Sequence, residues 1–346
     1  MPSNAPATNQ RTSASTSEAE QWIVGVDIGG TKVAAGLVNR STGAIRNATR
    51  MPMAARGDAA AGLAAVTGAI DALLSESQAA QSAAQGIGIC APGPLDPKTG
   101  VVLNPPNLPC WRNFPLAGEL SRIYGLPVQV DNDANAAALA ETLWGVGRGY
   151  RTVFYVTIGT GIGTGIVFDG QIYHGRTGSA AEGGHMTIDF DGPPCGCGKR
   201  GCIETFAAGP AIARLARARL LEAGSPNSRL LAFAGGNRDA ITSQHVGQAL
   251  AAGDPVAQHV LQQVVGYLSV WLGNIIDLLE PDVVIIGGGV ADMLKPFFPE
   301  ITRRLAGNCV NQRGQEIPLL AACYGADAGI AGGAALCVRA LQPERG

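Results

Sequence analysis

Hydrophobic residues occur along the chain in two kinds of segment. One kind is short and rich in β-branched residues, and the other is longer and contains scattered polar positions. Short runs bounded by glycine or proline are typical of buried strands, and long segments with scattered polar positions are typical of helices. In the N-terminal half, strands are predicted over residues 22–27, 33–38, 86–90 and 128–130, and helices over 59–74 and from 131 to about 144. The first two strands are joined by a tight turn and form a hairpin.

The C-terminal half repeats this order. Strands are predicted over residues 152–158, 165–168, 283–286 and 318–323, and helices over about 203–223, 256–279 and 326–339. Residues 145–149 are rich in glycine and are predicted to be a hinge, and residues 171–205 have no regular pattern. Because strands and helices alternate in both halves, we predict an α/β protein with two related layers.

Charge and composition exclude several classes of protein. The net charge of −2 gives no basic surface for nucleic acid, and no run approaches the roughly 18 apolar residues of a membrane-spanning helix. The first 20 residues lack the apolar core of a signal peptide and are predicted to be a disordered tail. Without an export signal we expect a cytoplasmic protein, whose eight cysteines are thiols or metal ligands rather than disulfides.

Glycine is unusually frequent, at 48 of 346 residues, about double ordinary usage. Three glycine clusters follow predicted strands, at residues 29–30, 159–165 and 287–289. The backbone N–H groups of such turns can close on an anion, and Thr31 and Thr160 add hydroxyl donors. Asp27, at a strand end, could hold Mg²⁺ directly or through water. The alternative interpretation is that each cluster is only a tight turn.

The spacing of these glycines excludes two common phosphate motifs. Gly159, Gly161, Gly163 and Gly165 are spaced by two, so the dinucleotide pattern G-x-G-x-x-G is absent. The pattern G-x-x-x-x-G-K-[ST] is also absent from the sequence.

A second group of residues is typical of a metal site. Three cysteines and one histidine fall within a short segment, namely His185, Cys195, Cys197 and Cys202. Three thiolates and one imidazole commonly hold Zn²⁺ in closed structural sites, and four such ligands leave no open position for catalysis. The alternative is a set of buried free cysteines. His174, His245 and His259 have no partner pattern and are predicted to lie on the surface.

Asp133 is the candidate acid/base residue, because it follows a predicted strand at the start of a helix. A carboxylate there can orient an acceptor hydroxyl and take its proton. The alternative is that Asp131 or Asn132 caps the helix and that Asp133 has no chemical role. Glu182 and Glu204 flank the metal segment, so a metal ion would preorganise them.

These motifs together resemble the ROK family of bacterial sugar kinases and repressors. The matching segments are 27–32 (Asp-Ile-Gly-Gly-Thr-Lys), 105–111, 132–135 (Asn-Asp-Ala-Asn), 157–165, 285–290, and the metal segments 182–185, 195–198 and 201–204. The resemblance implies a two-domain, actin-like (ribonuclease H-like) ATPase fold. It places a small α/β domain at 21–132 plus 324–343 and a large α/β domain with the zinc loop at 133–323.

The resemblance also implies the roles of individual residues, with Asp133 as the catalytic base. The hexose would be faced by Asn107, Asn132, Asp133, Glu182, His185 and Glu204. Mg-ATP would be bound by Asp27, Gly29, Gly30, Thr31, Lys32, Gly159, Thr160, Gly161, Gly163, Gly287 and Gly288. Some positions depart from the usual family pattern: Thr164 replaces a common glycine, Gly183 stands where isoleucine is frequent, and Ala208-Gly209 replaces a common Ser-Gly. We expect Thr164 to narrow the nucleotide cleft and Gly183 to loosen the sugar loop.

The predicted activity is therefore transfer of the γ-phosphate of ATP to the 6-hydroxyl of a hexose, with glucose as the first candidate and a homodimer implied by the family. An N-acetylglucosamine or N-acetylmannosamine kinase is the alternative enzyme. A sugar-responsive repressor is the alternative outside the enzymes. It is disfavoured because only about 20 polar residues precede Trp22, too few for a helix-turn-helix domain.

Overall fold

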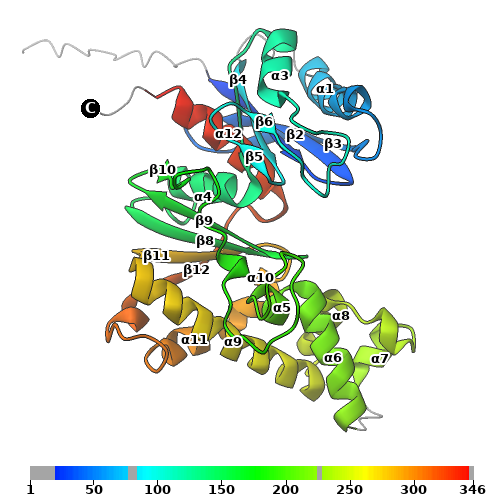
Figure 1. Ribbon diagram of the computed structural model, residues 1–346, viewed down its shortest axis with the longest axis vertical. Helices are drawn as coiled ribbons and strands as arrows, with labels where there is room; N and C mark the ends of the chain where they lie inside the picture. The colour runs from blue at the N-terminus through cyan, green and yellow to red at the C-terminus, as the bar shows by residue number, and fades with distance from the viewer. Residues whose placement is uncertain (1–19, 77–83, 224–227, 343–346) are drawn as a thin grey trace, which may run out of the picture.

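The computed structural model describes residues 20–76, 84–223 and 228–342. Within these ranges the chain forms two five-stranded sheets, with helices between the sheets and on both outer faces (Figure 1). Most of the predicted tail lies outside the described residues, and its last residue, Glu20, pairs with Arg46 at 3.2 Å.

The first sheet has the order β3-β2-β1-β4-β7. Its strands are β1 (Trp22–Ile28), β2 (Lys32–Asn39), β3 (Ile45–Pro52), β4 (Ala84–Ala91) and β7 (Val128–Asn132). The first three strands pair antiparallel, whereas β4 and β7 run parallel to β1. Helices α1 (Ala59–Ser75) and α3 (Leu116–Tyr124) cover the outer face, and β5 (Leu95–Asp96) pairs with β6 (Val101–Val102) beside it.

The second sheet has the order β10-β9-β8-β11-β12. Its strands are β8 (Thr152–Ile158), β9 (Ile162–Phe168), β10 (Gln171–Ile172), β11 (Val283–Gly287) and β12 (Leu319–Ala321). The outer face carries the largest apolar core, which is formed with α6 (Gly209–Ala223), α8 (Ser243–Ala251), α9 (Pro255–Leu279) and α11 (Phe298–Leu305). Shorter helices complete this half: α5 (Glu204–Ala207), α7 (Arg229–Phe233) and α10 (Ala291–Leu294).

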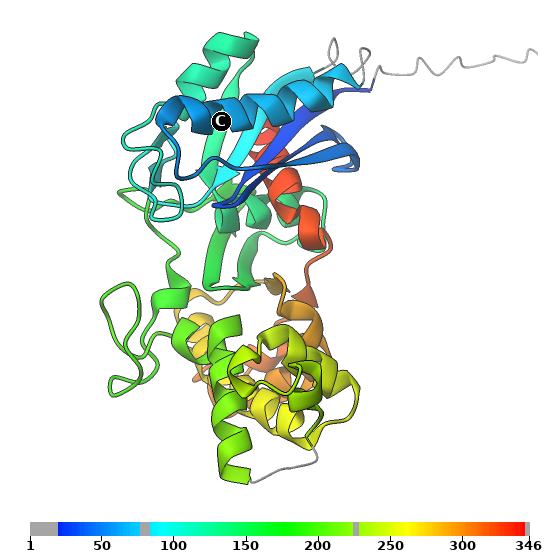
Figure 2. The same cartoon turned by 90° about the vertical axis from the view of Figure 1, so that its right-hand side faces the viewer.

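Two helices, α4 (Asp133–Leu143) and α12 (Ala328–Ala340), fill the space between the sheets (Figures 1 and 2). Alanine is the most frequent residue of both helices, and α12 also contains three glycines. Such small side chains let backbones approach closely. A Cβ added to Gly165 of β9 would lie 2.7 Å from the backbone oxygen of Ala134 in α4. The start of α4 is thereby held directly against the second sheet.

The chain crosses between the sheets after α4 and again before α12. Glu141, only 1% exposed, accepts hydrogen bonds from both crossings. The Val146 N–H donates to its carboxylate at 3.1 Å, and the Cys323 N–H donates at 2.8 Å. The predicted hinge at residues 145–149 is therefore tied to the second crossing through one buried side chain.

The predicted strands and helices follow one another in the structure in the predicted order, with the following differences. The predicted helix over 203–223 is two helices, because Ala208 is extended (φ −73°, ψ 163°) and turns the chain between α5 and α6. The strand predicted to begin at Gly165 begins at Ile162, so Gly163 belongs to β9 rather than to a turn and pairs with Thr157. The edge strand β3, the helices α3, α7, α8 and α11 and the two-residue strands β5, β6 and β10 were not predicted. The domain boundaries stay a prediction, since α4 contacts both sheets.

No helix in the part of the chain described by the structure combines the length and the apolar character that crossing a membrane requires.

Candidate active site

A cavity of about 680 Å³ opens where the end of β7 faces the turn between β8 and β9. It brings together many of the predicted site residues: Asn107, Asn132, Asp133, Gly159, Thr160, Gly161, Gly163, Glu182, His185 and Glu204. The lining also includes residues that were not predicted as site residues, among them Asp131, Asn135, Thr157 and Thr164. Residues from the two sheets thus converge on one space.

Asp133 is the first residue of α4, and its neighbours satisfy the helix start. The side-chain oxygen of Asn132 accepts the Ala134 N–H at 2.9 Å, so Asn132 is the N-cap. Asp131 accepts the Asn132 N–H at 2.6 Å and the Asn135 side-chain amide at 3.1 Å. Asp133 also accepts the Ala134 N–H, at 2.8 Å, while its side chain is exposed in the cavity. The three polar residues therefore have separate roles.

The pKa of Asp133 lies above its ordinary value of 3.8. The first cause is the surrounding protein, which removes bulk water from the carboxyl group; the negative charges of Asp27 and Glu182 add to the effect. The group remains accessible from the cavity. A carboxylate with a raised pKa in an open cavity is suited to accept a proton.

Glu204 connects the turn between β8 and β9 to the metal segment. Its Oε2 accepts the Ile162 N–H at 2.9 Å, and its Oε1 faces the Cys195 thiol at 3.9 Å. One carboxylate therefore contacts both the glycine turn and the cysteine cluster, and it also lines the cavity.

His185, Cys195, Cys197 and Cys202 are brought together as predicted, with their ligand atoms all within 4.8 Å of one another. The sulfur atoms of Cys197 and Cys202 are 3.7 Å apart, and Nδ1 of His185 lies 3.5 Å from the Cys195 sulfur. In a tetrahedron with Zn–S of about 2.3 Å and Zn–N of about 2.0 Å, these edges would be about 3.8 and 3.5 Å. The donor set and its spacing therefore fit Zn²⁺. The segment that carries it projects from the body of the molecule (green in Figure 2).

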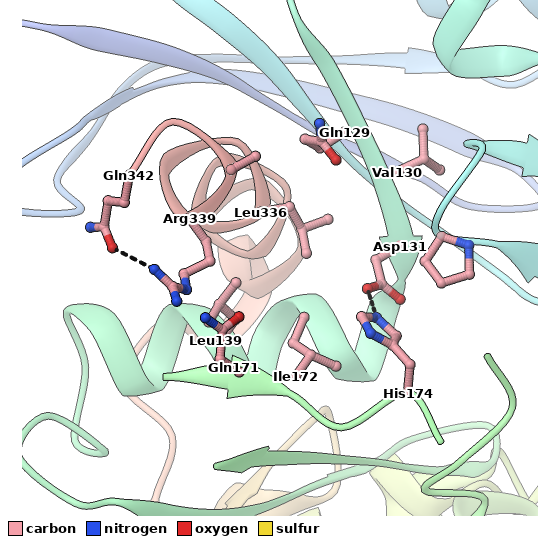
Figure 3. A pocket seen from close by; sticks show the side chains of 12 residues that line it. Gln129, Val130, Asp131, Leu139, Gln171, Ile172, His174, Leu336, Arg339 and Gln342 are labelled. Carbon is pink, nitrogen blue, oxygen red and sulfur yellow. Dashed lines mark hydrogen bonds and ion pairs between the residues drawn. The ribbon is translucent and has the colours of Figure 1, made fainter. Parts of the chain in front are cut away.

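The side chain of His174 is 32% exposed, but the prediction that it has no partner is wrong. Its Nε2 lies 2.6 Å from Oδ2 of Asp131, which is buried at the end of β7 (Figure 3). The pair lines a second cavity of about 310 Å³ between β7, β10 and α12, behind the segment that carries Asp133. No sequence pattern could reveal this partnership, since the two residues are 43 positions apart.

The first glycine turn does not line the large cavity. Gly29, Gly30, Thr31 and Lys32 lie between β1 and β2 or at the start of β2, but a Cβ at Gly30 would come within 2.9 Å of the Asn107 backbone oxygen. Asp27 accepts a hydrogen bond from the buried Cys90 thiol at 3.4 Å. Burial raises the pKa of Asp27 above its ordinary value. The turn therefore packs against the loop that carries Asn107.

The third glycine turn borders an apolar cavity of about 560 Å³. Gly289 lines it, whereas the predicted Gly287 and Gly288 do not; the other lining residues are Ser243, Gln244, Gly247, Leu250, Ala251, Asp292, Met293, Pro296 and Phe297. Gly209 links the two cavities, because its N–H donates to Gly159 at 2.8 Å and a Cβ there would lie 3.0 Å from the Ser243 hydroxyl oxygen. No sequence pattern indicated this cavity, because the helix α8 that lines it was not predicted.

Comparisons with known proteins agree with this architecture. The family model described as "ROK family" matches residues 23–340. A glucokinase from Halalkalibacterium halodurans is 35% identical over 91% of this chain and 94% of its own length, and one from Streptomyces coelicolor is 35% identical over 93% and 98%. A ROK family glucokinase from Streptomyces griseus, solved in complex with glucose and AMPPNP, is 36% identical, with a TM-score of 0.72 over 90% of this chain and 98% of that one.

The two sheets and the helices between them thus form the two-domain, actin-like ATPase fold of sugar kinases, as predicted. Within that class, the chain belongs to the ROK family.

Proposed function

We propose that this protein is an ATP-dependent glucokinase, which transfers the γ-phosphate of ATP to the 6-hydroxyl of glucose. The observation that carries the proposal is the position of Asp133, whose carboxylate faces the same cavity as the turn at Gly159–Gly161. A base and a phosphate-binding turn that share one space can align an acceptor hydroxyl with a γ-phosphate. The similarity to glucokinases over more than nine-tenths of the chain supports glucose as the acceptor.

In this proposal Asp133 orients the sugar hydroxyl and takes its proton as the phosphoryl group moves. Asn107, Asn132, Glu182, His185 and Glu204 would hold the remaining sugar hydroxyls, since all five line the cavity. Carboxylate, amide and imidazole groups suit a polyol because they offer both donors and acceptors.

The nucleotide would extend from the large cavity to the apolar one. The backbone N–H groups of Gly30 and Gly161, with the hydroxyls of Thr31 and Thr160, would hold the phosphates. Gly29 and Gly159 would shape the turns, because their N–H groups donate to the backbone oxygens of Lys32 and Gly161. Lys32, Gly163, Gly287 and Gly288 complete the predicted nucleotide set. The apolar cavity beside Gly289 fits the adenine base. Mg²⁺, when bound, neutralises charge on the phosphates, and Asp27 is its candidate ligand, directly or through water.

The cysteine cluster would hold a structural Zn²⁺. His185 would bind it through Nδ1, the atom that lies toward Cys195. Its other ring nitrogen is then free for the cavity that His185 lines. A metal ion bound there would fix the position of His185. Through the contact of Cys195 with Glu204, it would also fix a second residue of the cavity.

Family membership also supports a homodimer. Light scattering on the purified protein tests this oligomeric state.

A coupled assay with ATP across glucose, mannose, fructose, N-acetylglucosamine and N-acetylmannosamine tests the activity. We expect turnover with the highest kcat/KM on glucose, and a fall in kcat of at least about a hundredfold in Asp133→Asn. Calorimetric titration of that variant should show glucose binding retained. A higher kcat/KM on an N-acetylated sugar would show that glucose is not the preferred substrate. Near-normal turnover of Asp133→Asn would show that Asp133 is not the catalytic base.

A further inference from the structure

The segment that carries Glu182 is held by a side chain from the neighbouring strand. Thr164 lies in β9 and is only 5% exposed. Its hydroxyl donates to the backbone oxygen of Ala181 and accepts the Gly183 N–H at 2.8 Å. One hydroxyl group thus bonds the backbone on both sides of Glu182, whose side chain is exposed in the cavity.

The other polar group of Gly183 is held from α9. The indole Nε1 of Trp271, which is fully buried, donates to the Gly183 oxygen at 3.0 Å. Both backbone groups of Gly183 are therefore satisfied by side chains, Thr164 on one side and Trp271 on the other. An irregular segment gains a fixed position in this way, because buried backbone groups left without partners are costly.

Gly183 has no room for a side chain beside Thr164. A Cβ at Gly183 would lie 2.8 Å from the Thr164 hydroxyl oxygen and 3.2 Å from its methyl carbon. The two residues therefore lie in contact. Gly183 is buried and bonded at both ends, so it does not loosen the sugar loop as expected from the sequence.

We propose that Thr164 and Gly183 are a matched pair that positions Glu182, and that Thr164 is a positioning residue for sugar binding. The threonine occupies the space that a side chain at position 183 would need, and its hydroxyl bonds the backbone of Ala181 and of Gly183, the two residues that flank Glu182. The inference rests on the proposed function for its effect on sugar binding. The coupling between the two positions depends on the geometry alone.

Thr164→Val tests the hydrogen bonds, because it keeps the shape and removes the hydroxyl. We expect KM for glucose to rise roughly tenfold, as follows from a buried N–H left unpaired, while KM for ATP stays within about twofold. Thr164→Ser keeps the hydroxyl and should restore most of the affinity. Thr67→Val is the matched control, since the Thr67 hydroxyl bonds only to the Ala64 oxygen within α1. An equal rise in both KM values, or no rise, would overturn the positioning role.

A double-mutant cycle tests the pair itself. Gly183→Ile alone should lower Tm and glucose affinity, and adding Thr164→Gly should recover a large part of both, because the clash is removed. Additive losses in Tm would overturn the matched pair. If the unmodified protein phosphorylates no sugar, the proposed function fails, whereas the Tm cycle still decides whether the two positions are coupled.

Discussion

The imidazole of His174 and the carboxylate of Asp131 lie 2.6 Å apart and join the segment after β10 to the end of β7. The other oxygen of Asp131 accepts the Asn132 N–H and the Asn135 amide. The residues on both sides of Asp133 are therefore anchored to a carboxylate that His174 holds in place. The same segment leads toward Glu182, and the Ala180 N–H donates to the His174 backbone oxygen at 3.1 Å.

His174→Ala should lower kcat/KM about tenfold, because Asp131 loses its partner and its hold on the segment around Asp133 weakens. Steady-state kinetics measures the effect. His259→Ala is the matched control, since His259 is an exposed residue of α9, and it should leave kinetics unchanged. Equal kinetics in the two variants would show that the pair does not support catalysis.

Asp133→Asn should stabilise the fold at neutral pH. The folded protein raises the pKa of Asp133 above 3.8, so it holds this proton more tightly than the unfolded chain does. Unfolding free energy therefore decreases as pH rises from about 4 through the raised pKa. Thermal unfolding should show a higher Tm for Asp133→Asn at pH 7 and a difference close to zero near pH 3. A lower Tm for the variant at pH 7 would contradict this assignment of the shift.

Glu182→Gln should move the acid limb of the kcat profile to lower pH. The negative charge of Glu182 contributes to the raised pKa of Asp133, although less than burial does. Removing the charge lets Asp133 ionise at lower pH. The measurement is kcat at saturating sugar across the acid range. A shift to higher pH would mean that another group controls the limb.

Loss of the proposed Zn²⁺ should disorder the cavity where His185 and Glu204 line it. Cys197→Ser removes one ligand at an exposed position, so the loss of packing is small. We expect zinc content to fall well below one ion per chain by mass spectrometry, and kcat/KM for glucose to fall at least tenfold. Cys309→Ser, outside the cluster, is the control. Full activity in a zinc-free variant would exclude a role of the metal in arranging the site.

Gly247→Leu should weaken nucleotide binding. Gly247 lies in α8 and lines the apolar cavity, where the nearest atom to a new Cβ is 3.8 Å away. The leucine has room at its base and fills space assigned to adenine, so KM for ATP should rise at least tenfold while KM for glucose changes little. Gly118→Leu, in α3 with open space around it, is the control. Leucine favours a helix over glycine, so neither variant should lower Tm.

The pattern of apolar and polar residues predicted most of the architecture, because buried strands and long helices contain clear apolar runs. It missed β3 because that edge strand is largely exposed and carries polar residues such as Asn47, Thr49 and Arg50, so it has no apolar run. It placed Asp133 and the metal cluster because their neighbours in sequence are also their neighbours in space. His174 and the pair Thr164 and Gly183 act through contacts between distant segments, which no local pattern records.

The carboxylate of Glu141 lies where the chain passes between the two sheets. Helix α12 packs against the first sheet, although it follows the second sheet and its helices along the chain. The residues between α4 and α12, here called the second unit, are therefore inserted between two segments that pack on the first sheet. Both ends of the insertion meet at one side chain. The hydrogen bonds to Glu141 thus hold the two ends of a long chain segment together. The entropy lost by bringing these ends together grows only slowly with the length of the segment. The second unit could therefore grow or shrink among relatives without disturbing the first.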